Sequence, residues 1–312
     1  MLFSRAQIGV LLLGMCLPVL PAADHRTKSP ASDAEYRVDA NLVIVPVSVT
    51  DAQNHPITGL TRANFRVFDG GVEQRIVQLT RDETPMAVGL VFDTSLSMAS
   101  QLQAARAAAA SFLATANPED EFFLVEFQDQ AQITQSFTND PRDIGTRLAQ
   151  TRAKGHTALL DAVRLGIDHV RKSSKPRKAL LVLSDGGDNH SRFTERELAA
   201  LVRESDVLIY SMGVSKPARK FLPEQAGDGQ ELLEAVTRQS GGRLYVVDEH
   251  NGLAEVAARI GQELHNRYVL SYAPSNERSD GKYHKVQVKV TPPEGVPGLQ
   301  VSWRPGYVDP GL

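Results

Sequence analysis

Apolar segments of strand length alternate with amphipathic helical segments between residues 85 and 266, and this alternation constrains the fold most strongly. Met86–Phe92 and Ala179–Ser184 are apolar almost throughout, without the polar alternation of a strand that faces water. Strands of this kind are typical of a mostly parallel sheet that helices cover on both faces. We therefore predict an α/β fold, a doubly wound, mostly parallel (Rossmann-like) sheet, over 85–266. The helices expected between its strands are 101–116, 140–153, 158–171, 194–204, 231–240 and 252–266.

The segments on either side of this region are rich in short strands and turns. Residues 36–84 contain a valine-rich run, VIVPVSV, and a hairpin pattern, NFRVFDGGVEQRIVQLT, with Asp-Gly-Gly at its turn. Residues 267–312 contain three more strand patterns, separated by turns rich in Pro and Gly. The simplest arrangement is that 36–84 and 267–312 pair into one small β-sandwich, into which the 85–266 domain is inserted.

The N-terminal residues have the pattern of an export signal. One positive charge, Arg5, precedes an apolar run from Ile8 to Leu20, and small residues follow. We interpret 1–23 as a signal peptide and 24–35 as a flexible linker, so the mature protein is expected to be secreted or periplasmic. The alternative is an uncleaved membrane anchor, although the run is shorter than the ~20 residues of a membrane span. Cys16, the only cysteine, lies within the run, so cleavage leaves a chain without disulfides.

The charge balance gives no support to nucleic-acid binding. Among the 312 residues, 34 Lys and Arg stand against 37 Asp and Glu, and we find no basic tract. Proteins that bind nucleic acids concentrate Lys and Arg against the phosphates. We therefore expect no nucleic-acid partner, and we also expect no membrane span in the mature chain.

Three polar clusters lie at or beside the carboxyl ends of predicted strands, where doubly wound sheets bind ligands. Hard divalent cations such as Mg²⁺ bind oxygen ligands and tend to keep several waters. With few carboxylates in its shell, such a cation stays electrophilic and readily accepts an acidic side chain from a partner. The clusters are Asp93-Thr94-Ser95-Leu96-Ser97, Lys154-Gly155-His156-Thr157 and Ser184-Asp185-Gly186-Gly187-Asp188. The candidate ligands are two carboxylates and three hydroxyls: Asp93, Asp185, Ser95, Ser97 and Thr157.

Other roles are open to the first cluster. Asp and Ser are favoured at helix N-caps. A serine nucleophile needs a His and a carboxylate beside it, and the Gly-x-Ser-x-Gly elbow is absent. A Mg²⁺-dependent phosphatase that uses an aspartyl phosphate also begins with Asp after a parallel strand. That class needs a second carboxylate two residues later, or Thr four residues later, where this chain has Ser95 and Ser97; Lys154 or Lys178 is weak evidence for its lysine. A scaffold with an unoccupied site is a further alternative.

The three clusters together resemble the von Willebrand factor A domain with its metal-ion-dependent adhesion site. The shared features are Asp-x-Ser-x-Ser after a buried strand, a Gly-x-Thr loop before a helix, and an apolar strand that ends in SDGGD. Leu96 and His156 depart from the family pattern, because glycine is common at both positions. By this resemblance the metal-site residues are Asp93, Ser95, Ser97, Thr157 and Asp185.

The flanking segments resemble those of the exported bacterial A-domain proteins first noted in Acidobacteria, so the resemblance covers nearly the whole mature chain. From the export signal and the five oxygen ligands we predict a binding or adhesion module and not an enzyme. We expect Mg²⁺ or Mn²⁺ as the cofactor, with Ca²⁺ less favoured, and a protein partner whose acidic side chain completes the metal shell. The sequence leaves open the identity of the partner, whether it is a protein or a glycan, the oligomeric state, and whether the domain has open and closed conformations.

Overall fold

The computed structural model describes residues 42–214, 228–247, 252–275, 281–296 and 298–308. The predicted signal peptide, 1–23, and the predicted linker, 24–35, lie outside the described residues.

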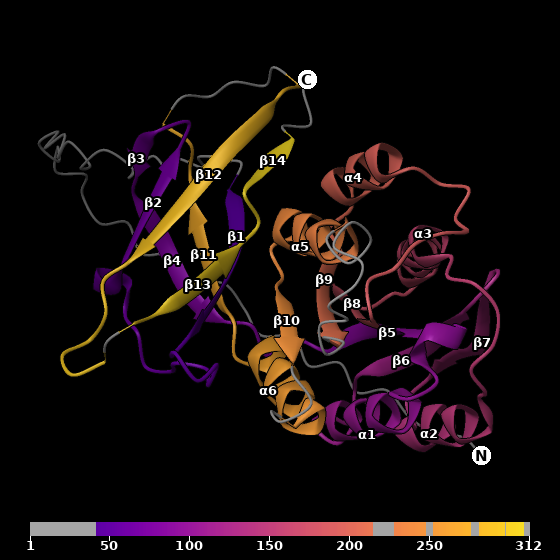
Figure 1. Ribbon diagram of the computed structural model, residues 1–312. Helices are drawn as coiled ribbons and strands as arrows, with labels where there is room; N and C mark the ends of the chain where they lie inside the picture. Colours follow the sequence, from indigo (N-terminus) through magenta and orange to yellow (C-terminus); the bar gives the residue numbers. More distant parts are fainter. Residues whose placement is uncertain (1–41, 215–227, 248–251, 276–280, 297, 309–312) are drawn as a thin grey trace, which may run out of the picture. The chain divides into compact units, whose positions relative to one another are not determined.

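A six-stranded sheet forms the centre of the α/β region, with the strand order β10-β9-β8-β5-β6-β7 (Figure 1). Neighbouring strands pair in parallel, except that β7 runs antiparallel to β6. The predicted α/β fold with a mostly parallel sheet is therefore confirmed. The strands are β5 (Met86–Asp93), β6 (Glu121–Phe127), β7 (Ala131–Thr138), β8 (Arg177–Ser184), β9 (Leu208–Val214) and β10 (Leu244–Val247).

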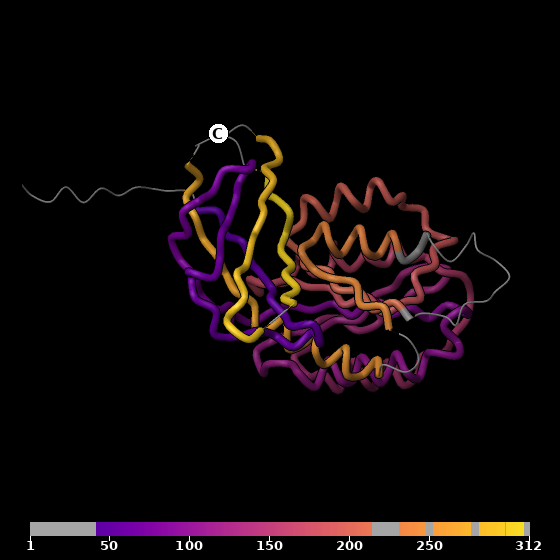
Figure 2. Tube along the Cα trace, turned by 60° about the vertical axis from the view of Figure 1, so that its left-hand side comes forward, coloured from indigo at the N-terminus to yellow at the C-terminus, as the bar shows by residue number. Residues whose placement is uncertain are grey.

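Helices cover both faces of this sheet, as Figures 1 and 2 show. One face packs against α1 (Leu102–Leu113), α2 (Pro141–Gln150) and α6 (Leu253–His265). The other packs against α3 (Leu159–Val170), α4 (Glu195–Glu204) and α5 (Asp228–Ser240). Successive side chains of β5 enter the two apolar cores in turn, because strand residues alternate between faces. Leu90 and Phe92 lie in the first core, and Val91 lies in the second.

Two helices begin directly after capping residues that can be recognised in the sequence. The Asp140 side chain accepts a hydrogen bond from the Arg142 N–H, and Pro141 occupies the first position of α2. Thr194 and Glu197 form a capping box at the start of α4. The predicted ends of α4 and α5 agree with the structure, at Glu204 and Ser240, whereas α1 ends at Leu113 and not at 116.

Strands from the two flanks of the chain form two four-stranded sheets, which share one apolar core. In each sheet the strands from before the α/β region pair with strands from after it. For example, β1 pairs with β11 and β13, and β2 pairs with β12. The first sheet has the order β13-β1-β11-β4, with β1 (Val43–Thr50), β4 (Ile76–Arg81), β11 (Tyr268–Tyr272) and β13 (Gln300–Trp303). The second has the order β14-β12-β2-β3, with β2 (Phe65–Asp69), β3 (Val72–Gln74), β12 (Tyr283–Val290) and β14 (Gly306–Val308).

Two short crossovers join these sheets to the α/β region, one between β4 and β5 and one between α6 and β11. Their backbones are hydrogen-bonded to each other, since Asp82 N donates to Arg267 O at 3.0 Å. Arg177, at the start of β8, forms an ion pair with Asp82 at 3.0 Å and donates to the carbonyl oxygens of Asp82 and Thr84. It also donates to the Leu264 carbonyl of α6. One guanidinium therefore fixes both crossovers against the central sheet.

A second buried polar cluster joins α6 to the sheet. The Glu263 carboxylate, which is 1% exposed, accepts hydrogen bonds from the hydroxyls of Tyr210 at 2.5 Å and Tyr245 at 2.6 Å. Arg243 stacks on Tyr245 and donates to the Thr50 hydroxyl of β1 at 2.9 Å. A buried carboxylate needs such partners, because an unpaired charge is costly in an apolar interior.

Among the described residues, no helix has the length and apolar character needed to cross a membrane.

The Asp120 carboxylate gives a test of this packing. It is buried and accepts from Met86 N and His265 Nε2, both at 2.9 Å, and from Asn117 N. Burial acts to raise the pKa of Asp120, but these hydrogen bonds outweigh it and hold the pKa below its ordinary value. Its stabilisation is therefore present above about pH 4 and is lost as the pH falls through the lower folded-state pKa.

We expect Asp120→Asn to lower the free energy of unfolding at pH 7 by about 1.5–3 kcal/mol, because hydrogen bonds to a charged group are lost. Urea titrations at several pH values measure the difference, which should shrink in acid as the wild-type carboxyl protonates. Glu119→Gln, at the exposed neighbouring position, is the matched control and should change little. A difference that is the same at neutral and acid pH contradicts the assigned role.

Candidate metal centre

Asp93 ends β5 with a fully buried side chain. Its Oδ1 accepts a hydrogen bond from Ser95 N at 2.8 Å, and its Oδ2 accepts one from the Ser184 hydroxyl at 2.6 Å. Burial raises the pKa of Asp93 to about 6, although the hydrogen bonds from Ser184 and Ser95 oppose the rise; the negative charge of Asp185 adds to it. Among the described residues, the groups that hydrogen-bond to this carboxylate are a hydroxyl and an N–H, and no cationic side chain forms an ion pair with it.

Ser95 and Ser97 place two hydroxyl oxygens side by side, 2.9 Å apart. They belong to a single 3₁₀ turn, Leu96–Met98, for which Ser95 is the N-cap residue. The Ser95 hydroxyl makes no capping hydrogen bond to this turn, and Gln101 occupies the N-cap of α1. Helix capping therefore does not explain the hydroxyls of the first cluster.

The second cluster is held against the first by backbone hydrogen bonds. Lys154 N donates to Thr94 O at 2.8 Å, and Leu96 N donates to Gly155 O at 3.1 Å. Gly155 has a φ of 71°, in the left-handed region that favours glycine. Thr157, at the end of this loop, is 3% exposed. The sequence alone does not reveal these bonds, because the two loops are about sixty residues apart in the chain.

The third cluster joins the second through Thr157. The N–H groups of Asn189 and His190 donate to Thr157 O at 3.0 and 3.1 Å, and Thr157 N donates to Asn189 Oδ1 at 3.0 Å. Asp185 follows β8 directly, and Gly186 after it adopts a φ of 87°. The Ser184 hydroxyl, which donates to Asp93, also accepts from Gly186 N at 3.1 Å. Hydrogen bonds thus link all three clusters at the carboxyl edge of the sheet.

The donor atoms of the predicted site fit a hard divalent cation. Two carboxylates and three hydroxyls are oxygen ligands only, which favours Mg²⁺ or Mn²⁺ over soft metals. No group of three or more His, Cys, Asp or Glu suited to a metal is present in the described part of the chain. The predicted site differs from such a group, because it combines three hydroxyls with only two carboxylates. That Asp93, Ser95, Ser97, Thr157 and Asp185 together bind a metal stays a prediction.

Several supporting residues were not singled out by the sequence pattern. The sequence shows Ser184 only as part of the SDGGD cluster, although its hydroxyl donates to Asp93 at 2.6 Å. The Asp129 carboxylate accepts from His156 N at 2.8 Å and so fixes the second loop. Asp161, in the first turn of α3, accepts from Phe193 N at 2.9 Å. The signal for such residues is weak, because Asp and Ser are common in loops for many reasons.

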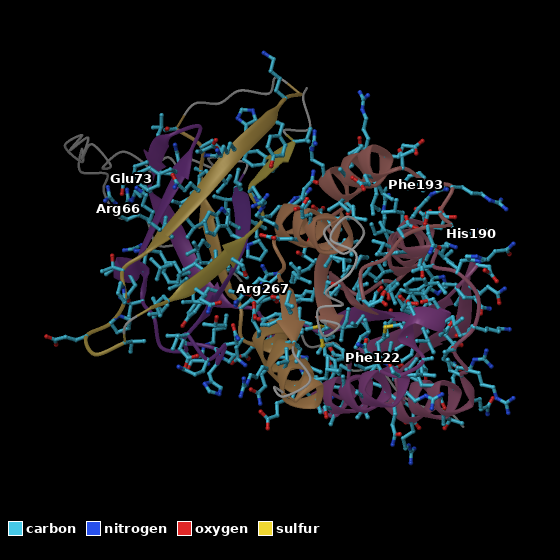
Figure 3. All side chains as sticks on the ribbon, in the orientation of Figure 1. Arg66, Glu73, Phe122, His190, Phe193 and Arg267 are labelled. Carbon is cyan, nitrogen blue, oxygen red and sulfur yellow. The ribbon has the colours of Figure 1, made fainter. Side chains whose placement is uncertain are left out.

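Exposed side chains surround the predicted metal site and form its rim: a leucine, two stacked histidines and an aspartate. Leu96, between two predicted ligands, is 64% exposed. His156 and His190 stack with ring centroids 5.1 Å apart, and His156 Nδ1 lies 2.9 Å from Asp129. Figure 3 labels His190 on the loop before α4. Among the described residues, no hydrogen bond joins a histidine to Ser95 or Ser97.

A comparison with known protein families matches residues 88–187 to the von Willebrand factor type A domain. This chain carries a von Willebrand factor type A domain. The matched segment contains all five predicted ligands, from Asp93 to Asp185. It does not reach the flanking sheets, so the A domain is shown and the likeness of the flanks to exported bacterial proteins stays a prediction.

Relatives of known sequence and structure are distant. The uncharacterized protein sll0103 of Synechocystis is 23% identical over 190 residues, which are 58% of this chain and 42% of that protein, so the match spans less than half of its length. A crystal structure of proximal thread matrix protein 1 from the mussel byssus matches with a TM-score of 0.50 and 17% identity, over 63% of this chain and 49% of that one. This likeness shows the A-domain fold. The domain of the type V pili tip protein Mfa5 from Porphyromonas gingivalis matches with a TM-score of 0.48 and 13% identity, over 59% and 96% of the two chains.

Gly155 gives a test of the loop geometry. A Cβ atom added there would lie 2.6 Å from a carboxylate oxygen of Asp129, in addition to the cost of the positive φ. We expect Gly155→Ala to lower the free energy of unfolding by about 1–3 kcal/mol and to weaken metal binding. Urea titration and calorimetry with Mg²⁺ measure the two effects.

Gly145→Ala is the matched control for this substitution. Gly145 lies on α2 with open space around its Cα, so alanine there should stabilise the helix by up to about 1 kcal/mol. If both variants are equally stable and bind Mg²⁺ equally, the second loop is not constrained as described.

Proposed function

We propose that this chain is an exported binding and adhesion module that holds Mg²⁺ or Mn²⁺ in its A domain and recruits an acidic side chain of a partner protein. The cation would be held by Asp93, Ser95, Ser97, Thr157 and Asp185. One observation supports this most directly: the buried Asp93 carboxylate has hydroxyl and N–H donors around it, but no cationic side chain of the described residues pairs with it.

The charges favour a cation at this position. Asp93 is buried and its pKa is raised, so its ionised form is destabilised by burial and by the charge of Asp185. When bound, a divalent cation supplies positive charge to both carboxylates and leaves coordination positions open to a further oxygen ligand. The chain's own part is to fix the oxygens: Ser184 and the Ser95 N–H orient Asp93, and the 3₁₀ turn sets the Ser95 and Ser97 hydroxyls together.

The exposed rim suggests which surface a partner meets. Leu96 offers an apolar contact beside the predicted cation, and the stacked pair of His156 and His190 lies on the second and third loops. A partner carboxylate at the metal with an apolar neighbour over Leu96 would match this surface. Recruitment of an acidic side chain is therefore proposed together with a short apolar contact.

The proposed export is supported by the N-terminal pattern at 1–23, which lies outside the described residues. A secreted or periplasmic location suits an adhesion module, because its partners are then on cell surfaces or in the envelope. Expression of the full chain, followed by N-terminal sequencing of the exported protein, tests whether cleavage occurs near Ala23.

The metal site is tested by removing one carboxylate. We expect Asp93→Ala to abolish Mg²⁺ binding in isothermal calorimetry, because the ligand that supplies most of the buried charge is lost. Asp168→Ala is the charge-matched control, since Asp168 is a half-exposed residue of α3 paired only with Arg164 on the same helix. Asp93→Ala that binds Mg²⁺ as tightly as the control would show that the site is assigned wrongly.

Partner recruitment is tested by capture from an envelope extract. We expect proteins to be retained on the immobilised chain with Mg²⁺ and lost with EDTA, and not to be retained by Asp93→Ala.

Leu96→Ser should keep Mg²⁺ binding but weaken capture by about tenfold, because a buried leucine contact is worth about 1.5 kcal/mol or more. Val72→Ser, at a similarly exposed valine of β3, is its control. Capture that EDTA does not change contradicts recruitment through the cation.

A measurement of phosphomonoester turnover distinguishes the phosphatase alternative from the binding module. It predicts hydrolysis of phosphomonoesters with Mg²⁺ that Asp93→Asn abolishes. The proposed binding module predicts no turnover across a broad phosphatase panel. The scaffold alternative predicts that calorimetry detects no divalent binding at millimolar metal.

A further inference from the structure

A cavity of about 640 Å³ lies at the end of the central sheet opposite Asp93. It is lined by the first residues of β5 and β8, Met86 and Arg177, which are register partners in the sheet. Both crossovers between the flanking sheets and the α/β region also line it, through Asp82, Thr84 and Arg267. The cavity is thus separate from the proposed metal centre, which lies where the same two strands end.

Arg267 is a buried cation in the lining of this cavity. Only 6% of the residue is exposed, and its Nε is buried without a hydrogen-bond partner. Its Nη2 donates to the Pro46 carbonyl at 3.1 Å, and no carboxylate of the described residues forms an ion pair with it. Figure 3 labels Arg267, which precedes β11. A guanidinium has five N–H donors, and a buried donor without a partner is costly, so this side chain is suited to a bound anion.

The neighbouring charges do not neutralise Arg267. Asp82 is already paired with Arg177, and Asp206 is paired with Arg304. Burial lowers the pKa of Arg177, and the positive charge of Arg267 lowers it further, while Asp82 opposes the change. The lining contains five cationic and two acidic side chains, an excess of three positive charges: Arg81, Arg177, Lys178, Arg267 and Arg304 against Asp82 and Asp206.

Many of the remaining lining residues are apolar, although Thr80, Ser240 and Tyr307 also line the cavity. The apolar residues include Ile44 and Pro46 of β1, Leu208 of β9, Leu264 of α6 and Val269 of β11. An anion without an apolar part would leave these side chains against water, whereas an apolar molecule without a charge would leave the positive charge of Arg267 without a counter-ion. A ligand that matches both features has an anionic head and an aliphatic body.

We propose that this cavity binds a small aliphatic anion, with its carboxylate or phosphate head at Arg267 and its hydrocarbon chain along Pro46 of β1 and Val269 of β11, which are register partners. Charge-assisted hydrogen bonds from a guanidinium to either head group are strong, and both head groups fit its fork of N–H donors. A ligand there would touch both crossovers, so its binding should raise the melting temperature of the protein.

The test is calorimetry of the purified protein in EDTA with four probes: octanoate, octyl phosphate, neutral octanol and inorganic phosphate. We expect octanoate or octyl phosphate to bind one to one, and the tighter of the two identifies the head group. Octanol and inorganic phosphate should each bind at least tenfold more weakly, because each lacks one of the two features. Asp93→Ala should bind the anion like the wild type, which separates this site from the metal centre.

Two variants locate the ligand in the cavity. Arg267→Met should weaken binding of the anionic probe by about ten- to a hundredfold and leave octanol unchanged, while Arg267→Lys should retain part of the affinity. Arg75→Met removes a positive charge at an exposed position outside the cavity lining and should have no effect. If Arg267→Met does not fold, Val269→Trp, which keeps Arg267 and fills the cavity from β11, should block binding.

The proposal is overturned if neither octyl probe binds at millimolar concentration. It is also overturned if Arg267→Met and Val269→Trp bind octanoate and octyl phosphate as tightly as the wild type, or if octanol binds as tightly as the anions.

Discussion

The hydrogen bond from the Ser184 hydroxyl to Asp93 joins the ends of two neighbouring parallel strands, β5 and β8, and the candidate metal centre depends on it. Its length is 2.6 Å, and both side chains are fully buried. The Asp93 carboxylate lies at the edge of an apolar core. Burial raises the pKa of Asp93, and the negative charge of Asp185 raises it further. A buried carboxylate in this setting is stabilised best by a cation, because hydroxyl donors orient the charge but do not neutralise it.

The sequence predicts the central sheet well, because fully buried strands lack polar alternation and the helices begin at recognisable caps such as Asp140 and Thr194. The order of strands and their register depend on contacts between distant segments, which local patterns do not contain. The same limit applies to the site. The motif spacing identifies Asp93, Thr157 and Asp185 as candidates, whereas the roles of Ser184 and Asp129 depend on side-chain directions set by the folded loops.

Sequence patterns also locate the ends of some helices less accurately than the structure does. Residue Thr151 adopts an extended backbone directly after α2, so this helix ends three residues before the predicted boundary. The boundaries proposed for the domains and the set of five ligands stay predictions. For the flanks, alternating valines predict strands, but only the fold pairs β1 with β11 and β13 across more than two hundred residues.

The two ends of the central sheet have opposite electrostatic character. The carboxyl end of β5 and β8 carries Asp93 and Asp185 and is proposed to attract a cation, whereas the amino end carries Arg177, with Arg267 beside it, and is proposed to attract an anion. Arg177 also binds the backbone of both crossovers, so the amino end fixes the flanking sheets to the A domain. The proposed recognition of partners and the attachment of the flanks thus use different ends of the same strands.

Anomalous diffraction from a crystal of the protein grown with Mn²⁺ tests the central claim most directly, because the signal locates the ion without any assumption about its ligands. The account predicts one strong peak among the side-chain oxygens of Asp93, Ser95, Ser97, Thr157 and Asp185, at about 2–2.2 Å from those that bind directly. Saturating Mn²⁺ with no peak at these oxygens, or with its only strong peak elsewhere on the chain, would contradict it.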